Sequence, residues 1–396
     1  MSIQQHSTNE ILRMFFAVFC TLVVFFSTVC SGVAQESSAA DPVDQNKLVR
    51  AIYDATKTVK TTKELTAFLV QCENALEVEL SPENRKYVVS LTGWGLNRRG
   101  ERHYEMAAQL KRIGNQQHQS AMGKAMKDFD AAIVAAPERY RSWMSRGIAY
   151  VANEEYGKAL ADFTSVIKLK PDVANGWFNR AEVLYQTGKF DYAIEDYNVA
   201  IRLNSDDAQA ITGRGLSFHS LGEFSKALAD FETVIKLQPQ CVEALVNRGD
   251  LFQEMERWQE SVDDYRAANE LKDSAIACQR LAWVLATCPE KEMREFDVAL
   301  TMAKKAVALS GDTAINLDTL AACEAAKGDF GAAMATQQKV IGLVGAEEEI
   351  TAKPFQARLM LYEKSEPYLQ TGAVDKKAIP DAKNNSSESN GQRTEK

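Results

Sequence analysis

The sequence predicts an all-α protein made of stacked helix pairs that follow an N-terminal targeting segment. The 396 residues contain only 21 glycines and 9 prolines, whereas average usage gives roughly 48 of the two together. Tight turns are therefore scarce, which disfavours a sheet-rich fold. The middle of the chain also repeats itself every 34 residues with helical spacing of its apolar positions, as in arrays whose neighbouring units bury each other's apolar faces.

The overall composition excludes two broad classes of protein. Hydrophobic residues make up 45% of the chain and charged residues 25%, which is ordinary for a folded protein and argues against disorder throughout. The net charge of −8 argues against a protein that coats nucleic acid or an anionic membrane surface. An acidic helical enzyme, a binding module and a structural scaffold stay open.

Residues 1–34 have the pattern of a secretory signal peptide. A polar stretch ends at Arg13, and Met14 to Cys30 is uncharged and mostly apolar. Small residues follow up to Ala34, after which we expect cleavage. An uncleaved membrane anchor is the alternative, because this apolar stretch is close to the shortest that spans a bilayer, and a lipid-anchored Cys30 is a weaker third. We expect an exported protein of the periplasm or cell envelope, anchored in the membrane only if the segment is retained.

Four blocks of 34 residues align without gaps, and they begin at Tyr140, Ala174, Ala208 and Val242. Positions 4, 8 and 11 share one face of a first helix, and positions 20, 24 and 27 share one face of a second. Small residues at position 20 allow the helices to approach closely, and aromatic residues at position 24 fill the space around that contact. The two sets are Ala159, Ala193, Ala227 and Ser261, and Phe163, Tyr197, Phe231 and Tyr265.

This pattern resembles the tetratricopeptide repeat family, whose signature is W-x2-L-G-x2-Y, then A-x3-F and P, within 34 residues. The resemblance implies antiparallel helix hairpins that stack into a right-handed superhelix, with a peptide-binding groove on the first helices. A stretch near the C-terminus (LAWVLATCPE, then LDTLAA and GDF) also resembles the closing segment of some exported bacterial members.

The repeat extends beyond the four core blocks in both directions, with departures from the pattern. Upstream, an insertion of about thirteen residues predicts long helices that project from the array. The expected units are a loosely repeat-like helical region at 46–92, a repeat with this inserted hairpin at 93–139, core repeats at 140–173, 174–207, 208–241 and 242–275, a divergent repeat at 276–313, a repeat at 314–347, a capping helix at 353–369 and a disordered tail at 371–396.

A charged pair recurs with the same period. Position 7 is arginine and position 23 is aspartate in all four core blocks, which gives the pairs Arg146 and Asp162, Arg180 and Asp196, Arg214 and Asp230, and Arg248 and Asp264. The inserted repeat carries Arg99 and Asp128 at the same places. A regular acidic partner at fixed spacing predicts a bidentate ion pair between the two helices of each repeat. The alternative is a ladder of arginines that binds an anionic ligand.

No motif for catalysis, cofactor binding or metal binding is found. The sequence has four histidines but no H-E-x-x-H, and it has no P-loop and no G-x-S-x-G elbow. The five cysteines beyond the signal form no C-x-x-C pair, so we expect them to be buried, with a Cys278–Cys288 bridge left open. We therefore predict a protein that is not an enzyme and that uses no cofactor and no metal.

The family resemblance also implies where a partner peptide would bind, because positions 5, 6, 9 and 12 of the first helices face the groove. The predicted groove residues are Met144, Ile148, Val151, Phe178, Asn179, Glu182, Tyr185, Thr212, Leu216, His219, Val246, Asn247, Asp250 and Gln253. Apolar residues dominate one end, and Glu182 and Asp250 make the other acidic, so we expect a peptide with apolar anchors and basic residues. The family's carboxylate clamp needs lysine at position 5 and asparagine at position 9, and both are absent.

The expected function is that of a non-catalytic, exported scaffold that binds a protein or peptide partner and no nucleic acid. One alternative is an envelope-associated assembly or secretion factor that works with membrane machinery. Another is an enzyme with its site in the 46–92 region or in the inserted hairpin, although neither region shows a nucleophile–base motif.

Overall fold

The structure, a computed structural model, describes residues 44–344 and 349–370, and the predicted signal peptide 1–34 and tail 371–396 lie outside them. Within the described residues it contains helices and no strands. The elements are α2 (Gln45–Ala55), α3 (Thr62–Glu77), α4 (Pro82–Arg112), α5 (His118–Ala135), α6 (Tyr140–Ala152), α7 (Tyr156–Leu169), α8 (Ala174–Gln186), α9 (Phe190–Leu203), α10 (Ala208–Ser220), α11 (Phe224–Leu237), α12 (Val242–Glu254), α13 (Trp258–Leu271), α14 (Ala275–Thr287), the 3-10 turn η1 (Lys291–Met293), α15 (Phe296–Ser310), α16 (Ala314–Ala326), α17 (Phe330–Val344) and α18 (Glu349–Glu363).

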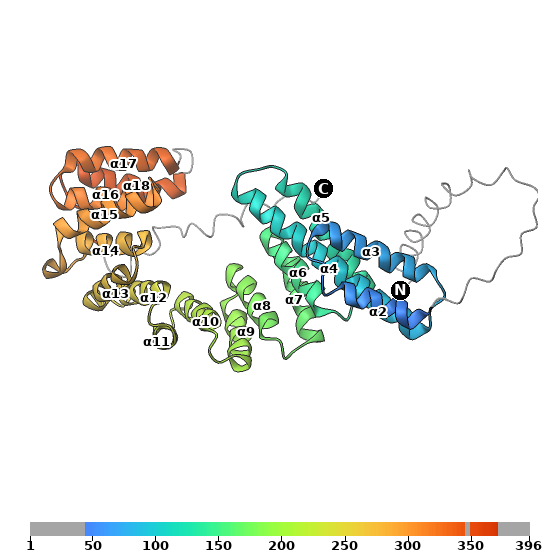
Figure 1. Cartoon of the computed structure of the whole chain (residues 1–396). Helices are drawn as coiled ribbons and strands as arrows, with labels where there is room; N and C mark the ends of the chain where they lie inside the picture. The colour runs from blue at the N-terminus through green and yellow to red at the C-terminus, as the bar shows by residue number, and fades with distance from the viewer. Residues whose placement is uncertain (1–43, 345–348, 371–396) are drawn as a thin grey trace, which may run out of the picture. The chain divides into compact units, whose positions relative to one another are not determined.

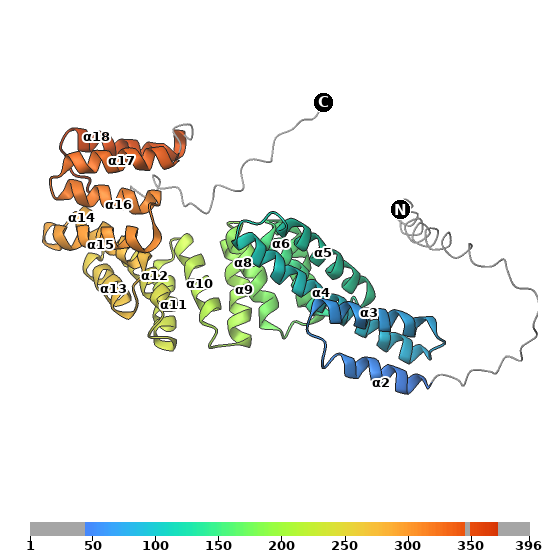
Figure 2. The same cartoon turned by 45° about the horizontal axis from the view of Figure 1, so that its top comes forward.

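Consecutive helices form hairpins, and each hairpin packs against the next along the chain (Figures 1 and 2). The chain therefore folds as the all-α solenoid of stacked helix pairs that the period predicts. The first helices α4, α6, α8, α10, α12, α14 and α16 also contact one another directly across successive hairpins. We call the surface that these first helices share the inner face.

Small residues on one helix and aromatic residues on its partner make each hairpin compact. A Cβ atom added to Gly147 would lie 2.6 Å from the ring of Phe163, and one on Gly249 would lie 2.6 Å from the ring of Tyr265. The position-20 residues Ala159 and Ala193 are fully buried between the helices. Any larger side chain at these places would separate the two helices, which explains why the sequence keeps them small.

The predicted boundary between residues 92 and 93 is wrong, because α4 continues through it as one helix of 31 residues. Gly93 and Gly95 permit close packing within this helix and do not end it. A Cβ on Gly95 would lie 2.7 Å from the ring of Phe68, and one on Gly93 would lie 2.8 Å from Cβ of Ala136. The two glycines thus let α3 and α5 pack closely against α4.

The long hairpin of α4 and α5 contacts the next repeat through residues near its base, and its tip at Ile113 is exposed. Tyr104 and Met122, from its two helices, pack beside the fully buried Ala149 of α6. An open pocket of about 510 Å³ separates the two long helices from the end of α6 at Asn153. The inserted residues therefore line this pocket beside the next repeat.

Two C-terminal boundaries also differ from prediction. The divergent repeat predicted at 276–313 begins earlier, since α14 starts at Ala275, where the Ser274 side chain caps the helix. The capping helix predicted at 353–369 is α18, and it ends at Glu363. Ser365 adopts a left-handed conformation with φ 61°, and the residue before Pro367 is biased away from the helical region. Residues 364–370 are therefore not helical.

Candidate functional site

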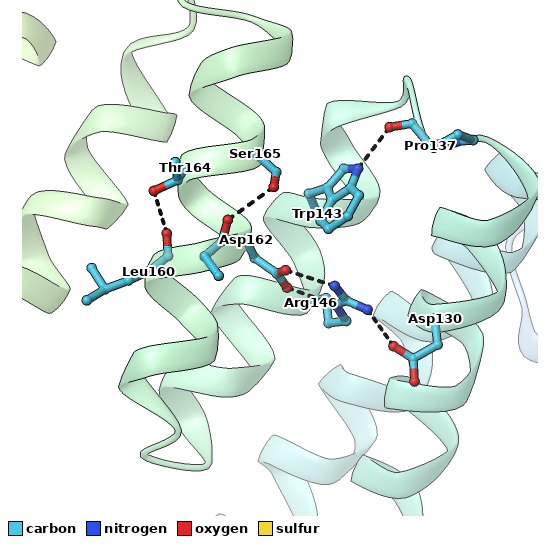
Figure 3. Close-up of polar contacts among 9 residues, drawn as sticks. Asp130, Pro137, Trp143, Arg146, Leu160, Asp162, Thr164 and Ser165 are labelled. Atoms are coloured by element: carbon cyan, nitrogen blue, oxygen red, sulfur yellow. Dashed lines mark hydrogen bonds and ion pairs between the residues drawn. The ribbon is translucent and has the colours of Figure 1, made fainter. Parts of the chain in front are cut away.

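The arginine and aspartate that recur with the repeat form bidentate ion pairs between the two helices of their hairpins. In each pair the arginine Nε and Nη2 atoms donate to the two carboxylate oxygens. The distances lie between 2.6 and 2.9 Å for Arg99 with Asp128, Arg146 with Asp162, Arg180 with Asp196, Arg214 with Asp230, and Arg248 with Asp264. Figure 3 shows the pair of Arg146 and Asp162.

The same arginines also join neighbouring hairpins. Nη1 of Arg146 donates to Asp130 of the preceding hairpin at 2.7 Å (Figure 3), and Nη1 of Arg214 donates to Asn198 at 2.7 Å. The indole of Trp143 covers the Arg146 guanidinium with its ring centre 5.1 Å away. Because these donors are engaged within the array, they are not available as a ladder for an anionic ligand.

Apolar side chains of α6, α8 and α10 lie partly accessible on the inner face, and most of them also pack against the cores of their hairpins. Ile148 is 38% exposed, and Met144, Phe178, Tyr185 and Leu216 are each half-buried. We call these five residues the open row. All five were predicted for the groove, and they lie on three consecutive first helices that contact one another.

The two acidic residues of the predicted groove do not form a free acidic patch. The hydroxyl of Tyr197 donates to Glu182 at 2.5 Å, and that of Tyr265 donates to Asp250 at 2.6 Å. Nε of Arg280 also lies 3.1 Å from Asp250. Burial raises the pKa of Asp250, although Arg280 and the Tyr265 hydroxyl act in the opposite direction. The expectation of a basic partner rested on these carboxylates, which are already partnered within the chain.

The other predicted groove residues divide into buried and engaged side chains. Val246 is only 3% exposed and belongs to the core around α12 and α14, so it does not line a groove. Nε2 of His219 lies 2.8 Å from the Glu254 carboxylate. The Asn179 and Thr212 side chains donate to backbone carbonyls of their own helices, Gln253 donates to Gln370, and Val151 and Asn247 are half-buried.

A pocket between α4 and α6 was missed by the sequence reasoning. It has a volume of about 460 Å³ and is lined by Trp94, Asn97, Arg98, Glu101, Arg139 and Arg141. Glu101 accepts hydrogen bonds from Arg98 at 2.7 Å and from Asn97 at 2.8 Å. Burial and the charge of Arg141 lower the pKa of Arg139. These residues come from two segments about forty residues apart in the sequence. The only signal in the sequence is the repeat register, which places Asn97 and Arg98 just before the position-7 residue Arg99.

No metal, redox or membrane-spanning feature is found in residues 44–344 and 349–370. No group of three or more His, Cys, Asp or Glu side chains there is placed to hold a metal ion. All five cysteines of this part of the chain are free, so Cys278 and Cys288 are not bridged. None of its helices combines the length and apolar character needed to cross a bilayer.

A family model matches the sequence in the region where the structure shows regular hairpins. Residues 144–208 and 212–276 each match the model of the tetratricopeptide repeat. Residues 144–208 and 212–276 therefore consist of tetratricopeptide repeats. No curated protein matches the chain's sequence. The two matched segments cover most of α6 to α13, the hairpins that contain the open row and all the arginine pairs except Arg99 with Asp128.

Solved structures resemble parts of this chain. The Cut9–Hcn1 hetero-tetramer of the APC/C aligns with a TM-score of 0.50 and 18% identity over 75% of this chain and 52% of that one. MamA aligns with a TM-score of 0.37 and 21% identity over 40% of this chain and 94% of its own. YrrB, a tetratricopeptide repeat protein with an unusual peptide-binding site, aligns with a TM-score of 0.37 and 19% identity over 44% of this chain and 88% of its own. At these identities the likeness concerns the fold.

Proposed function

We propose that this protein is a non-catalytic scaffold that binds an extended segment of a partner protein on the inner face of α6, α8 and α10. The observation that carries the proposal is the open row. Its apolar side chains remain accessible on three adjoining helices, whereas the equivalent carboxylates are already partnered. Accessible apolar and aromatic side chains of this kind hold the anchor residues of bound peptides.

The partner segment carries an acidic group beside its apolar anchors. Three arginines and one glutamate line the pocket between α4 and α6, so the pocket is positively charged. Arg141 precedes Met144 of the open row by less than one turn of α6. One segment therefore reaches both places, with its anchors on the row and its carboxylate beside Arg139 and Arg141.

Replacing Phe178 and Tyr185 together by alanine tests this function. A photo-crosslinking residue at Ile148 first identifies the partner segment, and the affinity of a synthetic peptide of that segment is then measured. We expect the double variant to bind the peptide at least ten-fold more weakly, with unchanged helicity, because truncating anchor contacts costs about 1 to 2 kcal/mol or more. Tyr192→Ala is the control, since Tyr192 is 63% exposed on a second helix. Equal affinity of the double variant and wild type would rule out the open row.

We further propose that the scaffold is exported and acts at the cell envelope. The support is the pattern of residues 1–34, with the apolar stretch from Met14 to Cys30 and small residues up to Ala34. The intact mass of the protein isolated from its own cells tests this, and loss of residues 1–34 is expected. A full-length mass in a membrane fraction would favour the anchored alternative, in which the scaffold serves membrane-bound assembly or secretion machinery.

A further inference from the structure

Residues 364–370, which follow α18, lie against the inner face of α12 and α14. The backbone amide of Gln370 donates to the carbonyl of Thr287 at 2.8 Å, and its side-chain amide donates to the Thr287 hydroxyl at 2.6 Å. The Gln253 side chain donates to the Gln370 side-chain oxygen at 3.0 Å. The Tyr368 ring packs on Trp283 with 5.6 Å between ring centres. Backbone, amide and aromatic groups of the segment are therefore all engaged.

The segment begins from a rigid anchor. Nε of Arg358 in α18 donates to Asp318 of α16 at 2.8 Å, and both side chains are nearly inaccessible, at 5% and 7% exposed. The Arg358 guanidinium also lies 5.5 Å from the ring centre of Trp283 and 5.3 Å from that of Tyr368. Helix α18 packs on α17 at the end of the array, and residues 364–370 lead from it to α14.

The segment contacts the helix positions that are equivalent to the open row. Trp283 is the ninth residue of α14, as Ile148 is of α6, and Gln253 is the twelfth residue of α12, as Tyr185 is of α8. A short non-helical stretch that is held by side-chain and backbone hydrogen bonds and by one aromatic anchor has the features of a bound peptide. Pro367 restricts its backbone, which lowers the entropy lost on binding.

We propose that the inner face of α12 and α14 is a second peptide-binding site, separate from the open row, and that residues 364–370 are its resident ligand. The site takes a segment with an aromatic residue that stacks on Trp283 and, two residues later, an amide side chain that bonds to Thr287 and Gln253. A partner segment of this chemistry binds only when the chain's own segment leaves. The proposal does not depend on the function assigned to the open row.

Tethering determines how firmly the site is closed. A short linker presents its ligand at an effective concentration on the order of 1 mM. If the free segment binds with a Kd of about 100 μM, the resident segment weakens the binding of a second copy about ten-fold. Releasing the resident segment by substitution should therefore restore binding from solution by about that factor.

The experiment uses the full chain and a fluorescent synthetic peptide with the sequence of residues 364–370. Fluorescence anisotropy measures the binding of this peptide to wild type and to the variant Tyr368→Ala with Gln370→Ala. We expect the released variant to bind the peptide about ten-fold more tightly than wild type does. Glu366→Ala is the matched control, because Glu366 is exposed within the same segment and its removal should leave the site closed.

A second peptide with alanine in place of the tyrosine tests the aromatic anchor and should not bind to the released variant. Equal binding of the tyrosine peptide to wild type and released variant would overturn the proposal, because the segment would then not close the site. Failure of a released variant with an unchanged melting temperature to bind the peptide would overturn it too. Equal binding of both peptides would show that the Trp283 contact gives no specificity.

Discussion

The hairpins from α4 to α13 and those from α14 to α18 differ in the residue that packs between the helices of each hairpin and in what lies on the inner face. In the first region, arginine at the seventh position of each repeat pairs across its hairpin, and the inner face of α6, α8 and α10 stays accessible. In the second region the seventh residues of α14 and α16 are Leu281 and Leu320, which contribute to the apolar core. The ion pair there joins Asp318 to α18, and residues 364–370, which follow α18, cover the inner face of α14.

This difference shows how the end of a repeat array is protected. A terminal hairpin has no neighbour on one side, so its apolar surface must be covered by a capping element. Here α18 provides that cover and leads into residues 364–370 on α14. The pairs of the first region lie between the two helices of a hairpin, where they stabilise the array without occupying the surface that binds a peptide.

Breaking the ion pair between Asp318 and Arg358, which joins α18 to α16, should have the largest effect on stability. Asp318→Ala leaves Arg358 buried without its carboxylate, and we expect a loss of about 3 to 5 kcal/mol in the free energy of unfolding. Urea titration followed by circular dichroism measures this loss. The control is Asp297→Ala, because Asp297 pairs with Lys327 but is 89% exposed and its loss should cost no more than about 1 kcal/mol. Equal effects of the two substitutions would contradict a buried role for Asp318.

Among the hairpins from α4 to α13, removing one arginine should lower the free energy of unfolding by less than Asp318→Ala does. Arg180→Met leaves Asp196 buried while solvent still reaches the site, since Arg180 is 23% exposed. We expect a loss of about 2 kcal/mol, below the range for fully buried pairs, measured by the same titration. Lys57→Met removes a pair in which both partners are more than half exposed and should be nearly neutral. A neutral Arg180 variant would show that the pairs do not stabilise the array.

A smaller effect should follow from adding one methyl group between two hairpins. The missing side chain of Gly213 makes room for Tyr197, and an added Cβ would lie 2.4 Å from the Tyr197 ring. We expect Gly213→Ala to destabilise the fold by about 1 kcal/mol, at the low end of the cost of overpacking because only one methyl group is added. The same substitution at Gly123, a helical and exposed position with no atom within 4 Å, should stabilise it by about 0.5 to 1 kcal/mol. Thermal melts of both variants measure this: the melting temperature should fall for Gly213→Ala and rise for Gly123→Ala.

The period predicted the repeating parts of this molecule because each repeat places the same side chains in the same contacts. The hairpins of the core and the pairing of Arg146 with Asp162 both follow from that regularity. The boundary before Gly93 was set by extending the 34-residue register upstream, which α4 does not follow because it begins at Pro82.

The remaining features leave no periodic trace in the sequence. Gln370 contacts Gln253 although more than a hundred residues separate them, and the arginine pocket joins α4 to the start of α6. Contacts of this kind depend on how the array ends and on single side chains. The sequence pattern therefore did not distinguish the open part of the inner face from its covered part.

Photo-crosslinking from position 368 tests this distinction most directly. A benzophenone amino acid replaces Tyr368 in the full chain, and mass spectrometry identifies the joined peptides after irradiation. The structure predicts an intramolecular link to α14 near Trp283, 5.6 Å from the tyrosine ring, while the same residue at Phe178 forms no link to residues 364–370. A protein that crosslinks from position 368 to α8 or α10, or only to other chains, would contradict an inner face that is open in one half and covered in the other.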